Sequence, residues 1–313
     1  MGAGAVGGYM GGMLARSGVD VTLIARGAHL EAMRSNGLTI DSFRGEFRIP
    51  VQVVQSPDQA GSPVDIVLFC VKSYDTDQAI DALRGLMERN PDARVVCLQN
   101  GVSNEVKLAE AFGADRVLSG VVYIGAEIAR PGVIRHESRG EIILGAYGSG
   151  QERWVERLAA VFNKAEVPTE MATDVRAVKW EKFLFNCALN SMTTLTGCRL
   201  GTLMGIAETR ALFRGVVLEA EAVARKEGVN LAPDVVERVM ATAERMNIRS
   251  SMLADFEHGR PIEMDTFNGY VVQLGARHGV ATPYNEALYA LLKALVSADS
   301  GRAAVKGPGA GPE

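Results

Sequence analysis

The chain has 313 residues, of which 47% are hydrophobic and 22% charged, and its formal net charge is −4 at pH 7. This length has room for two domains, each with its own core, and the composition is ordinary for a globular protein. The negative charge gives no electrostatic basis for binding nucleic acid or an anionic membrane, and the apolar stretches fall short of the ~18 residues that a membrane span needs.

A glycine-rich run opens the chain with the residues Gly2-Ala3-Gly4-Ala5-Val6-Gly7. A helical pattern follows as far as Gly18, and a strand-like run occupies residues 21–24. In a dinucleotide-binding turn, Gly2 would make the tight turn, Gly4 would let the backbone approach a pyrophosphate, and Gly7 would let the helix pack on the sheet. Such a run is weak evidence alone, but the helix and the second strand in the right order favour a nucleotide site.

The second strand ends in Ala25-Arg26, where an NAD-binding protein would carry an acidic residue for the ribose 2′-hydroxyl. Arg26 follows Gly7 by 19 residues, close to the expected spacing of ~20. A guanidinium can pair with a 2′-phosphate, whereas a carboxylate would repel it. Arg26 therefore predicts NADP(H) as the cofactor, with a solvated surface arginine as the alternative interpretation.

A dinucleotide-binding fingerprint also needs a strand before its first glycine, and only Met1 precedes Gly2. We therefore expect the natural reading frame to extend upstream by about five to eight residues that form this central strand. A basic segment followed by an apolar one is absent from this start, so it does not have the pattern of a signal peptide.

Strand and helix signals alternate in the first part of the chain, which predicts a Rossmann-type, doubly wound parallel sheet in a domain of residues 1–172. The expected strands are residues 64–71, 95–98, 117–124 and 141–144, with a turn at Pro131-Gly132, and the expected helices are residues 76–88, 105–112 and 152–162.

Helical periodicity dominates after residue 173, which predicts an all-α second domain of residues 173–299. Its helices are expected at residues 175–195, 208–227, 233–246, 263–278 and 285–296. Residues 300–313 are rich in glycine, proline and alanine, and we expect a disordered tail there.

Three polar residues, Lys182, Asn186 and Asn190, recur at every fourth position within an otherwise apolar helical stretch. Such positions share one face of a helix. Burying an unpaired neutral group costs roughly 1–3 kcal/mol, and an unpaired charge costs more. This polar ladder is therefore either matched by hydrogen bonds from a neighbouring helix or reserved for a polar ligand.

Further candidate site residues lie at strand ends and near a helix start. Lys72 and Asn100 each follow a predicted strand of the sheet, where α/β proteins bind ligands, although both also suit ordinary turns. Glu263 and Asp265 lie at the expected start of the helix at residue 263, and Ser251 lies in the segment before it. Acidic residues in a first helical turn commonly interact with the helix dipole, which is the alternative to a role in binding.

Together these motifs make the chain resemble the ketopantoate reductase (2-dehydropantoate 2-reductase) family, within the 6-phosphogluconate-dehydrogenase-like superfamily. The resemblance covers nearly the whole chain except the tail. It is carried by GAGAVGG at 2–8, VKSYDT at 71–76, LQNGV at 98–102, KFLFNCALN at 182–190 and SSMLADFEHGRPIEMD at 250–265.

The resemblance implies reduction of ketopantoate to pantoate by NADPH, a step of pantothenate and coenzyme A biosynthesis. Lys182 would be the general acid, and Glu263 would hold the substrate hydroxyl and help to fix Lys182. The other implied substrate-binding residues are Asn100, Asn186, Asn190 and Ser251. The implied cofactor-binding residues are Gly2, Ala3, Gly4, Ala5, Val6, Gly7, Arg26, Lys72 and Asn100.

One departure from the family pattern leaves the exact substrate open. Some members carry an asparagine ten residues after the second asparagine of the ladder, whereas this chain has Leu200. Alternatives are therefore reduction of another 2-keto acid, another enzyme of the superfamily such as an opine or polyol-phosphate dehydrogenase, or a non-catalytic NADPH-binding regulator. A regulator would be expected to lose Lys182 or Glu263, and both are present.

The cysteines and histidines make no metal-ligand or disulfide pattern. The four cysteines, Cys70, Cys97, Cys187 and Cys198, lie singly in apolar segments and predict reduced thiols in a cytoplasmic protein. The histidines form no metal-ligand cluster with the cysteines or with each other. The expected partner is a small 2-keto acid, and a homodimer is a possible assembly.

The cofactor assignment predicts the effect of replacing Arg26 with an acidic residue. Arg26→Asp should weaken NADPH binding and shift preference toward NADH, because a carboxylate would repel the 2′-phosphate. The measurement is the ratio of kcat/KM for the two cofactors, and an unchanged ratio would make Arg26 an ordinary surface residue.

Overall fold

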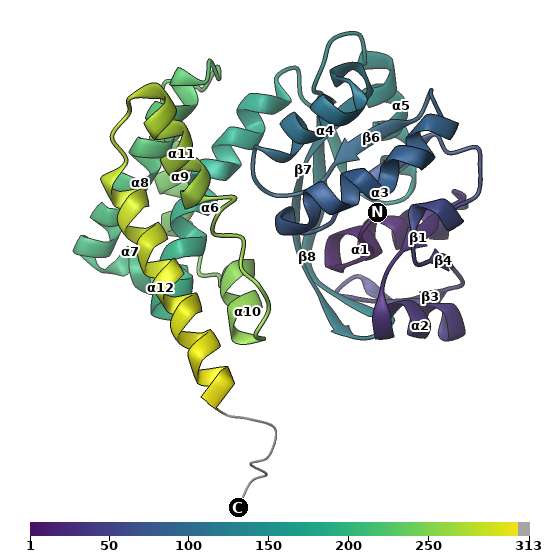
Figure 1. The fold of residues 1–313 in the computed structure, drawn as a ribbon, viewed down its shortest axis with the longest axis horizontal. Helices are drawn as coiled ribbons and strands as arrows, with labels where there is room; N and C mark the ends of the chain where they lie inside the picture. The colour runs from purple at the N-terminus through teal and green to yellow at the C-terminus, as the bar shows by residue number, and fades with distance from the viewer. Residues whose placement is uncertain (306–313) are drawn as a thin grey trace, which may run out of the picture. The chain divides into compact units, whose positions relative to one another are not determined.

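The computed structural model describes residues 1–305, with side chains described as far as residue 298 (Figure 1). The chain forms two compact units, Met1–Lys179 and Trp180–Glu313. The division falls inside the helix α6 (Val175–Thr196), whose first turn belongs to the first unit.

The first unit alternates strands and helices along its sequence. Its helices are α1 (Ala5–Arg16), α2 (Gly27–Asn36), α3 (Thr76–Arg89), α4 (Asn104–Phe112) and α5 (Glu152–Lys164). Its strands are β1 (Thr22–Ile24), β2 (Leu38–Ser42), β3 (Gly45–Ile49), β4 (Gln52–Val54), β5 (Ile66–Phe69), β6 (Arg94–Cys97), β7 (Val117–Arg130), β8 (Val133–Ala146) and β9 (Thr169–Met171).

Seven strands form the main sheet, in the order β3-β2-β8-β7-β6-β5 with β9 beside β8, while β1 and β4 pair in a second, parallel sheet. The strands β5, β6 and β7 are parallel neighbours, which confirms the α/β class. The main sheet is nevertheless mixed, because β7 and β8 form an antiparallel hairpin and β2 pairs with β3 in the same way.

The hairpin of β7 and β8 extends well beyond the strands expected at residues 117–124 and 141–144. The two strands meet at Pro131-Gly132, where the turn was expected. Their outer parts carry charged side chains, with Arg135 Nη1 and Glu127 Oε1 3.0 Å apart across the pair. An antiparallel pair can expose one face to water, so these parts lack the continuous apolar run that marks a buried strand.

The backbone of the first three residues connects β5 with β1. The amine of Met1 donates to Leu68 O at 2.7 Å, and the N–H of Cys70 donates to Met1 O at 2.9 Å. On the other side, the N–H of Ala3 donates to Ile24 O at 2.9 Å. The glycine turn therefore begins beside the carboxyl ends of both strands.

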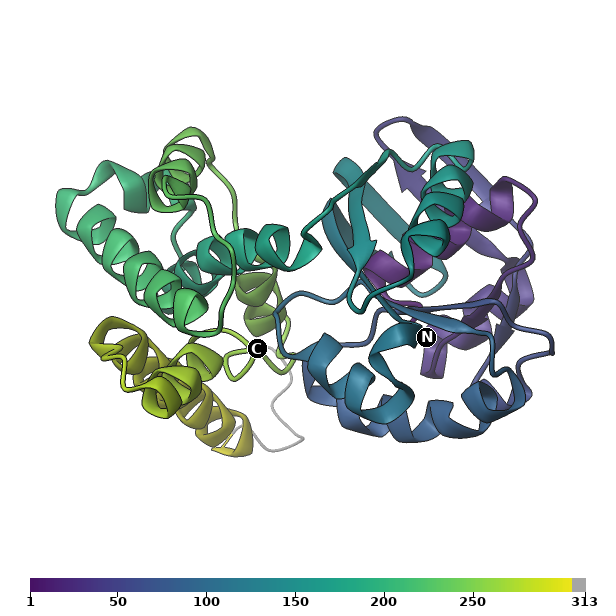
Figure 2. The same cartoon turned by 90° about the horizontal axis from the view of Figure 1, so that it is seen from above.

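Helices cover both faces of the main sheet (Figure 2). Side chains alternate along β6: Val96 joins the core under α1 and α5, whereas Val95 and Cys97 join the core under α3 and α4. Each face thus has its own apolar core, as expected for a doubly wound domain.

A buried ion pair lies within the first unit, between Lys179 of α6 and Glu105 in the first turn of α4. Their side chains are 7% and 2% exposed. The hydroxyl of Ser119 donates to Glu105 Oε1 at 2.7 Å, and Lys179 Nζ lies 3.8 Å from Cys97 Sγ. Burial opposes the charge of Lys179, but Cys97 and the Glu105 carboxylate together more than offset this and raise the pKa of Lys179. The pair links α6 to α4, and Ser119 extends this link to β7.

The second unit consists of helices throughout its described part, which confirms the expected all-α second domain. They are the remainder of α6, α7 (Leu200–Gly205), α8 (Ala207–Lys226), α9 (Val235–Arg245), α10 (Ser251–Glu257), α11 (Asn268–His278) and α12 (Pro283–Val305). The first residues of the expected tail at 300–313 belong to α12, and residues 306–313 of that tail lie outside the described part.

The expected helix at residues 263–278 begins later, at Asn268, so Glu263 and Asp265 lie in a turn before α11. The N–H of Thr266 donates to Glu263 O at 3.1 Å and closes this turn, while the Asp265 carboxylate accepts from the hydroxyl of Tyr289. The two carboxylates therefore lie outside the first turn of a helix, and the dipole interpretation does not apply to them.

The buried ion pair makes a stability prediction. Glu105→Ala should lower the free energy of unfolding by about 3–5 kcal/mol, because it leaves the Lys179 ammonium buried without its carboxylate. The matched control is Lys107→Ala on the same helix, which removes an exposed pair with Asp77 and should cost about 0–1 kcal/mol.

Denaturant titration of both variants gives the comparison. Adding Lys179→Met to Glu105→Ala should recover part of the loss, since the uncompensated charge is then gone. Equal stability of the Glu105 and Lys107 variants would contradict a structural role for the buried pair.

Candidate active site

The first three residues lie beside β1, and the turn that joins them to α1 requires glycine at two positions. Gly2 has a φ of +84°, and a Cβ on it would lie 2.8 Å from the Val71 nitrogen. A Cβ on Gly7 would lie 2.3 Å from Gly2 O. These contacts are with backbone atoms that cannot move aside, so the turn is closed against side chains and lies directly against the end of β5.

Gly4 differs from both, because a Cβ on it would meet nothing within 4 Å. It is the N-cap of α1, and no side chain caps this end of the helix. The first N–H groups of a helix lack partners within the helix and attract anions. The open space beside Gly4 therefore fits the pyrophosphate of a dinucleotide, with the amides of Ala5, Val6 and Gly7 in the first turn.

The polar residues after β5 and β6 lie together with this turn. Gln99 Nε2 donates to Val71 O at 2.8 Å and to Thr76 Oγ1 at 2.9 Å, and Asn104 Nδ2 donates to Asn100 O at 2.9 Å. These bonds join the ends of both strands, so that Lys72 and Asn100 follow strands whose ends are fixed beside Gly2. Gln99 and Asn104, whose buried amides join the two strand ends, are not among the residues predicted from the sequence.

Arg26 lies where the sequence placed it, after β1 and at the N-cap of α2. Its side chain is exposed. The bond from Ala3 to Ile24 brings the end of β1 beside the glycine turn. The first unit thus has an uncapped glycine turn, an exposed guanidinium and two polar strand ends, a set of groups that fits NADPH.

In the second unit, the polar ladder lies on a buried part of α6. Asn186 is 9% exposed and Asn190 is 3% exposed, while Phe183, Leu184 and Cys187 around them are 0–1% exposed. Lys182, at the head of the ladder, is half-buried. The ladder residues therefore lie between buried apolar residues of α6, within the second unit.

The side-chain amides of Asn186 and Asn190 make no hydrogen bond within the described part of the chain. Their neighbours behave differently: Ser191, Thr193 and Thr196 each donate to a carbonyl one turn earlier, at 2.6–2.7 Å. At these two positions, therefore, no amide hydrogen bond joins α6 to a neighbouring helix in the described part of the chain. Neither amide is among the fully buried polar atoms that lack a partner, so the polar atoms of both keep accessible surface, where a polar ligand could bind.

Two contacts bring the segment with Ser251 and Glu263 against α6. Thr193 Oγ1 lies 2.7 Å from Ser250 Oγ, next to Ser251. The rings of Phe183 and Phe267 stack with centroids 6.0 Å apart, which places the turn that contains Glu263 against the first half of α6. Residues next to Ser251 and Glu263 therefore contact α6.

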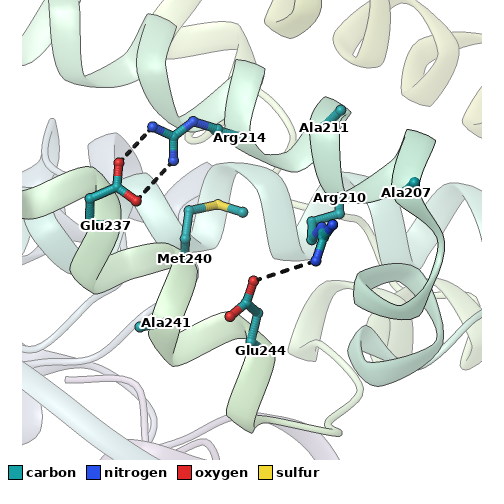
Figure 3. Close-up of a pocket in the computed structure, with 8 residues that line it drawn as sticks. All are labelled: Ala207, Arg210, Ala211, Arg214, Glu237, Met240, Ala241 and Glu244. Carbon is teal, nitrogen blue, oxygen red and sulfur yellow. Dashed lines mark hydrogen bonds and ion pairs between the residues drawn. The ribbon is translucent and has the colours of Figure 1, made fainter.

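A surface hollow between α8 and α9 contains none of the predicted site residues (Figure 3). Arg214 forms a two-point ion pair with Glu237, with nitrogen–oxygen distances of 2.6 and 3.1 Å, and Arg210 lies 4.0 Å from Glu244. Because its charges pair with each other, this hollow is a groove between packed helices and offers no group for chemistry.

Within residues 1–298, no cluster of three or more histidine, cysteine or acidic side chains could hold a metal ion. The helices of the described chain are all too short or too polar to cross a membrane. All four cysteines are free thiols, with Cys97 and Cys187 buried.

Comparison with known proteins agrees with this geometry. The family model for ketopantoate reductase PanE/ApbA matches residues 1–149, and the model for its C-terminal part matches residues 174–296. The chain belongs to the ketopantoate reductase family. It is 32% identical to the 2-dehydropantoate 2-reductase of Pyrococcus horikoshii, over 96% of this chain and 98% of that protein.

Solved structures with the same fold include a PanE/ApbA family ketopantoate reductase from Ralstonia eutropha. It is 37% identical, with a TM-score of 0.88 over 96% of this chain and 98% of that one. A D-mandelate dehydrogenase in complex with NADH is 25% identical, with a TM-score of 0.86 over 95% of this chain and 97% of that one. As a member of this family, the protein is an NADP-dependent oxidoreductase.

The ketopantoate reductase family also gives a context for Leu200. It is the first residue of α7, it is fully buried, and its N–H donates to Ile248 O at 2.9 Å. An apolar side chain thus fills this place, and no polar group from residue 200 can reach a substrate.

The glycine turn yields a paired prediction. Gly4→Ala should fold with little change in thermal midpoint, because its methyl group meets no atom, but should weaken NADPH binding at least about tenfold by filling the space of the pyrophosphate. Gly7→Ala should lower the free energy of unfolding by about 1–3 kcal/mol or more, because its methyl group overlaps Gly2 O.

Thermal unfolding and NADPH titration of both variants give the measurement. A Gly4→Ala variant that binds NADPH normally would contradict a phosphate site beside Gly4. A Gly7→Ala variant as stable as the parent would contradict the closed turn.

Proposed function

We propose that this chain reduces 2-dehydropantoate to pantoate with NADPH, as a step of pantothenate and coenzyme A biosynthesis, and that Lys182 delivers the proton. One observation carries the proposal. The side-chain amides of Asn186 and Asn190 make no hydrogen bond within the described chain, and their polar atoms keep accessible surface one and two helical turns after Lys182. A small polar substrate on this face of α6 would satisfy both amides beside an ammonium group.

The first unit would hold the cofactor. NADPH, when bound, supplies the hydride. The amides at the start of α1 and the turn at Gly4 would hold its pyrophosphate, and the guanidinium of Arg26 would pair with its 2′-phosphate. Lys72 and Asn100, at the ends of β5 and β6, would contact it from the neighbouring strands.

Lys182 would act on the ketone oxygen of the substrate. Reduction of a ketone builds negative charge on this oxygen, and a nearby ammonium both stabilises the charge and donates the proton. General acid catalysis of this kind contributes roughly 10²–10⁴-fold to the rate. Partial burial of Lys182 strengthens its electrostatic effect, because less water screens the charge.

The remaining residues of the second unit would orient the substrate. Asn186 and Asn190 would donate amide hydrogens to its carboxylate or hydroxyl oxygens, and Ser251 would add a hydroxyl group. The Glu263 carboxylate would accept from the substrate hydroxyl and keep the Lys182 ammonium in place. Such positioning reduces the barrier by presenting the ketone in one reactive geometry.

A different 2-keto acid is the second candidate substrate. The burial of apolar Leu200 supports it, because one polar contact of the family pattern is replaced by hydrocarbon. The likeness to a D-mandelate dehydrogenase supports the same class of reaction with a larger apolar substituent. An NADPH oxidation assay against a panel of 2-keto acids separates the two, and no oxidation with any of them would favour a non-catalytic regulator.

We further propose that the enzyme works in the cytoplasm, which the four free thiols support. A homodimer stays a prediction, and sedimentation of the purified protein tests it.

The proposed acid predicts the behaviour of a Lys182 variant. Lys182→Ala should lower kcat with 2-dehydropantoate by at least about 10², the scale of general acid catalysis, while NADPH binding changes little. The control is Lys226→Ala at the exposed end of α8, which should leave kcat unchanged. Near-normal turnover of the Lys182 variant would exclude Lys182 as the acid.

A further inference from the structure

A pair of buried hydroxyl groups connects α6 with the start of α10. Thr193 and Ser250 are 0% and 3% exposed, and their oxygens lie 2.7 Å apart. Ser250 is the N-cap of α10 and accepts the N–H of Leu253 at 3.0 Å. Thr193 also lies 2.7 Å from Leu189 O, one turn earlier on α6.

The protons of these hydroxyls fit only one complete arrangement. Each hydroxyl carries one proton, and Leu189 O can only accept. All three contacts are made together when Ser250 donates to Thr193 and Thr193 donates to Leu189 O. Ser250 then caps α10 with its oxygen and ties α10 to α6 with its proton.

The segment before α10 is held by further contacts to the same region. The N–H of Leu200 donates to Ile248 O at 2.9 Å, and the guanidinium of Arg199 donates to Asn247 O at 2.9 and 3.2 Å. These bonds use backbone oxygens of the segment. The contact between Thr193 and Ser250, in contrast, involves a side chain at the N-cap of α10.

We propose that Thr193 and Ser250 are positioning residues of the active site, which hold Ser251 beside Asn190. Thr193 follows Asn190 by three positions, so both lie on the same side of α6, and Ser251 directly follows Ser250. The inference rests on the proposed function, in which Asn190 and Ser251 contact the substrate. The hydroxyl pair fixes the distance between these two groups without touching the substrate.

The test uses a substitution that removes the hydrogen bond between Thr193 and Ser250 but keeps Ser250 as the N-cap of α10. Thr193→Val keeps the shape of the side chain, and Ser250 can still accept from Leu253 in this variant. The matched control is Thr196→Val on the same helix, because the Thr196 hydroxyl makes the same kind of bond to Met192 O at 2.7 Å without a link to α10. Thr193→Ser restores the hydroxyl and is the conservative variant.

Steady-state kinetics with 2-dehydropantoate and NADPH should separate these variants. Thr193→Val should raise KM for the keto acid by about tenfold, the scale of one lost buried hydrogen bond, with KM for NADPH unchanged. Thr193→Ser and Thr196→Val should behave like the parent. An unchanged KM for the keto acid, or an equal effect of Thr193→Val and Thr196→Val, would overturn the proposal.

Amide hydrogen exchange tests the contact between Thr193 and Ser250 independently of activity. Thr193→Val should speed amide exchange in residues 250–257 and leave α8 unchanged, even if the chain reduces no keto acid and the proposed function fails. Equal exchange in the parent and the variant would contradict the contact between Thr193 and Ser250.

If Thr193→Val does not fold, Ser250→Gly removes the same contact while glycine remains acceptable at an N-cap, and it should show the same kinetic pattern. An unchanged KM for the keto acid in Ser250→Gly would overturn the proposal.

Discussion

A polar side chain that is buried needs a partner, and α6 shows how this constraint divides the residues of one helix. Lys179 pairs with Glu105, and the hydroxyls of Ser191 and Thr193 bond to backbone oxygens. Asn186 and Asn190 are left without a partner in the described chain. On this helix, several polar groups bond within the protein, the Thr194 hydroxyl is buried without a partner, and the amides of Asn186 and Asn190 keep accessible atoms for a ligand.

In the first unit, the ends of β5 and β6 beside the glycine turn show a similar division between bonded and open groups. The buried amides of Gln99 and Asn104 fix the ends of β5 and β6. The backbone amides at the start of α1 have no side-chain cap and face open space beside Gly4. In both units, hydrogen-bonded elements surround a few donors that would meet a ligand, which is the arrangement that prepares a site before its ligand arrives.

Local sequence patterns were enough to predict the fold class, the bounds of helices such as α3 and α5, and the closed glycine turn. They failed where partners are distant. Glu105 and Lys179 are separated by 74 residues, and Thr193 and Ser250 by 57, so no spacing links them. The outer parts of β7 and β8 depend on cross-strand pairs that no local pattern shows, and the late start of α11 is likewise not visible in the local sequence.

Nuclear magnetic resonance of the side-chain amides tests the central claim most directly. The signals of Asn186 and Asn190 can be assigned by substitution and followed while pantoate is added in the presence of NADP⁺. Both signals should shift and saturate together with pantoate binding, while the exposed amide of Asn163, which is bonded to Thr169, stays unchanged. Binding of pantoate without any shift at Asn186 and Asn190 would contradict a substrate site on α6.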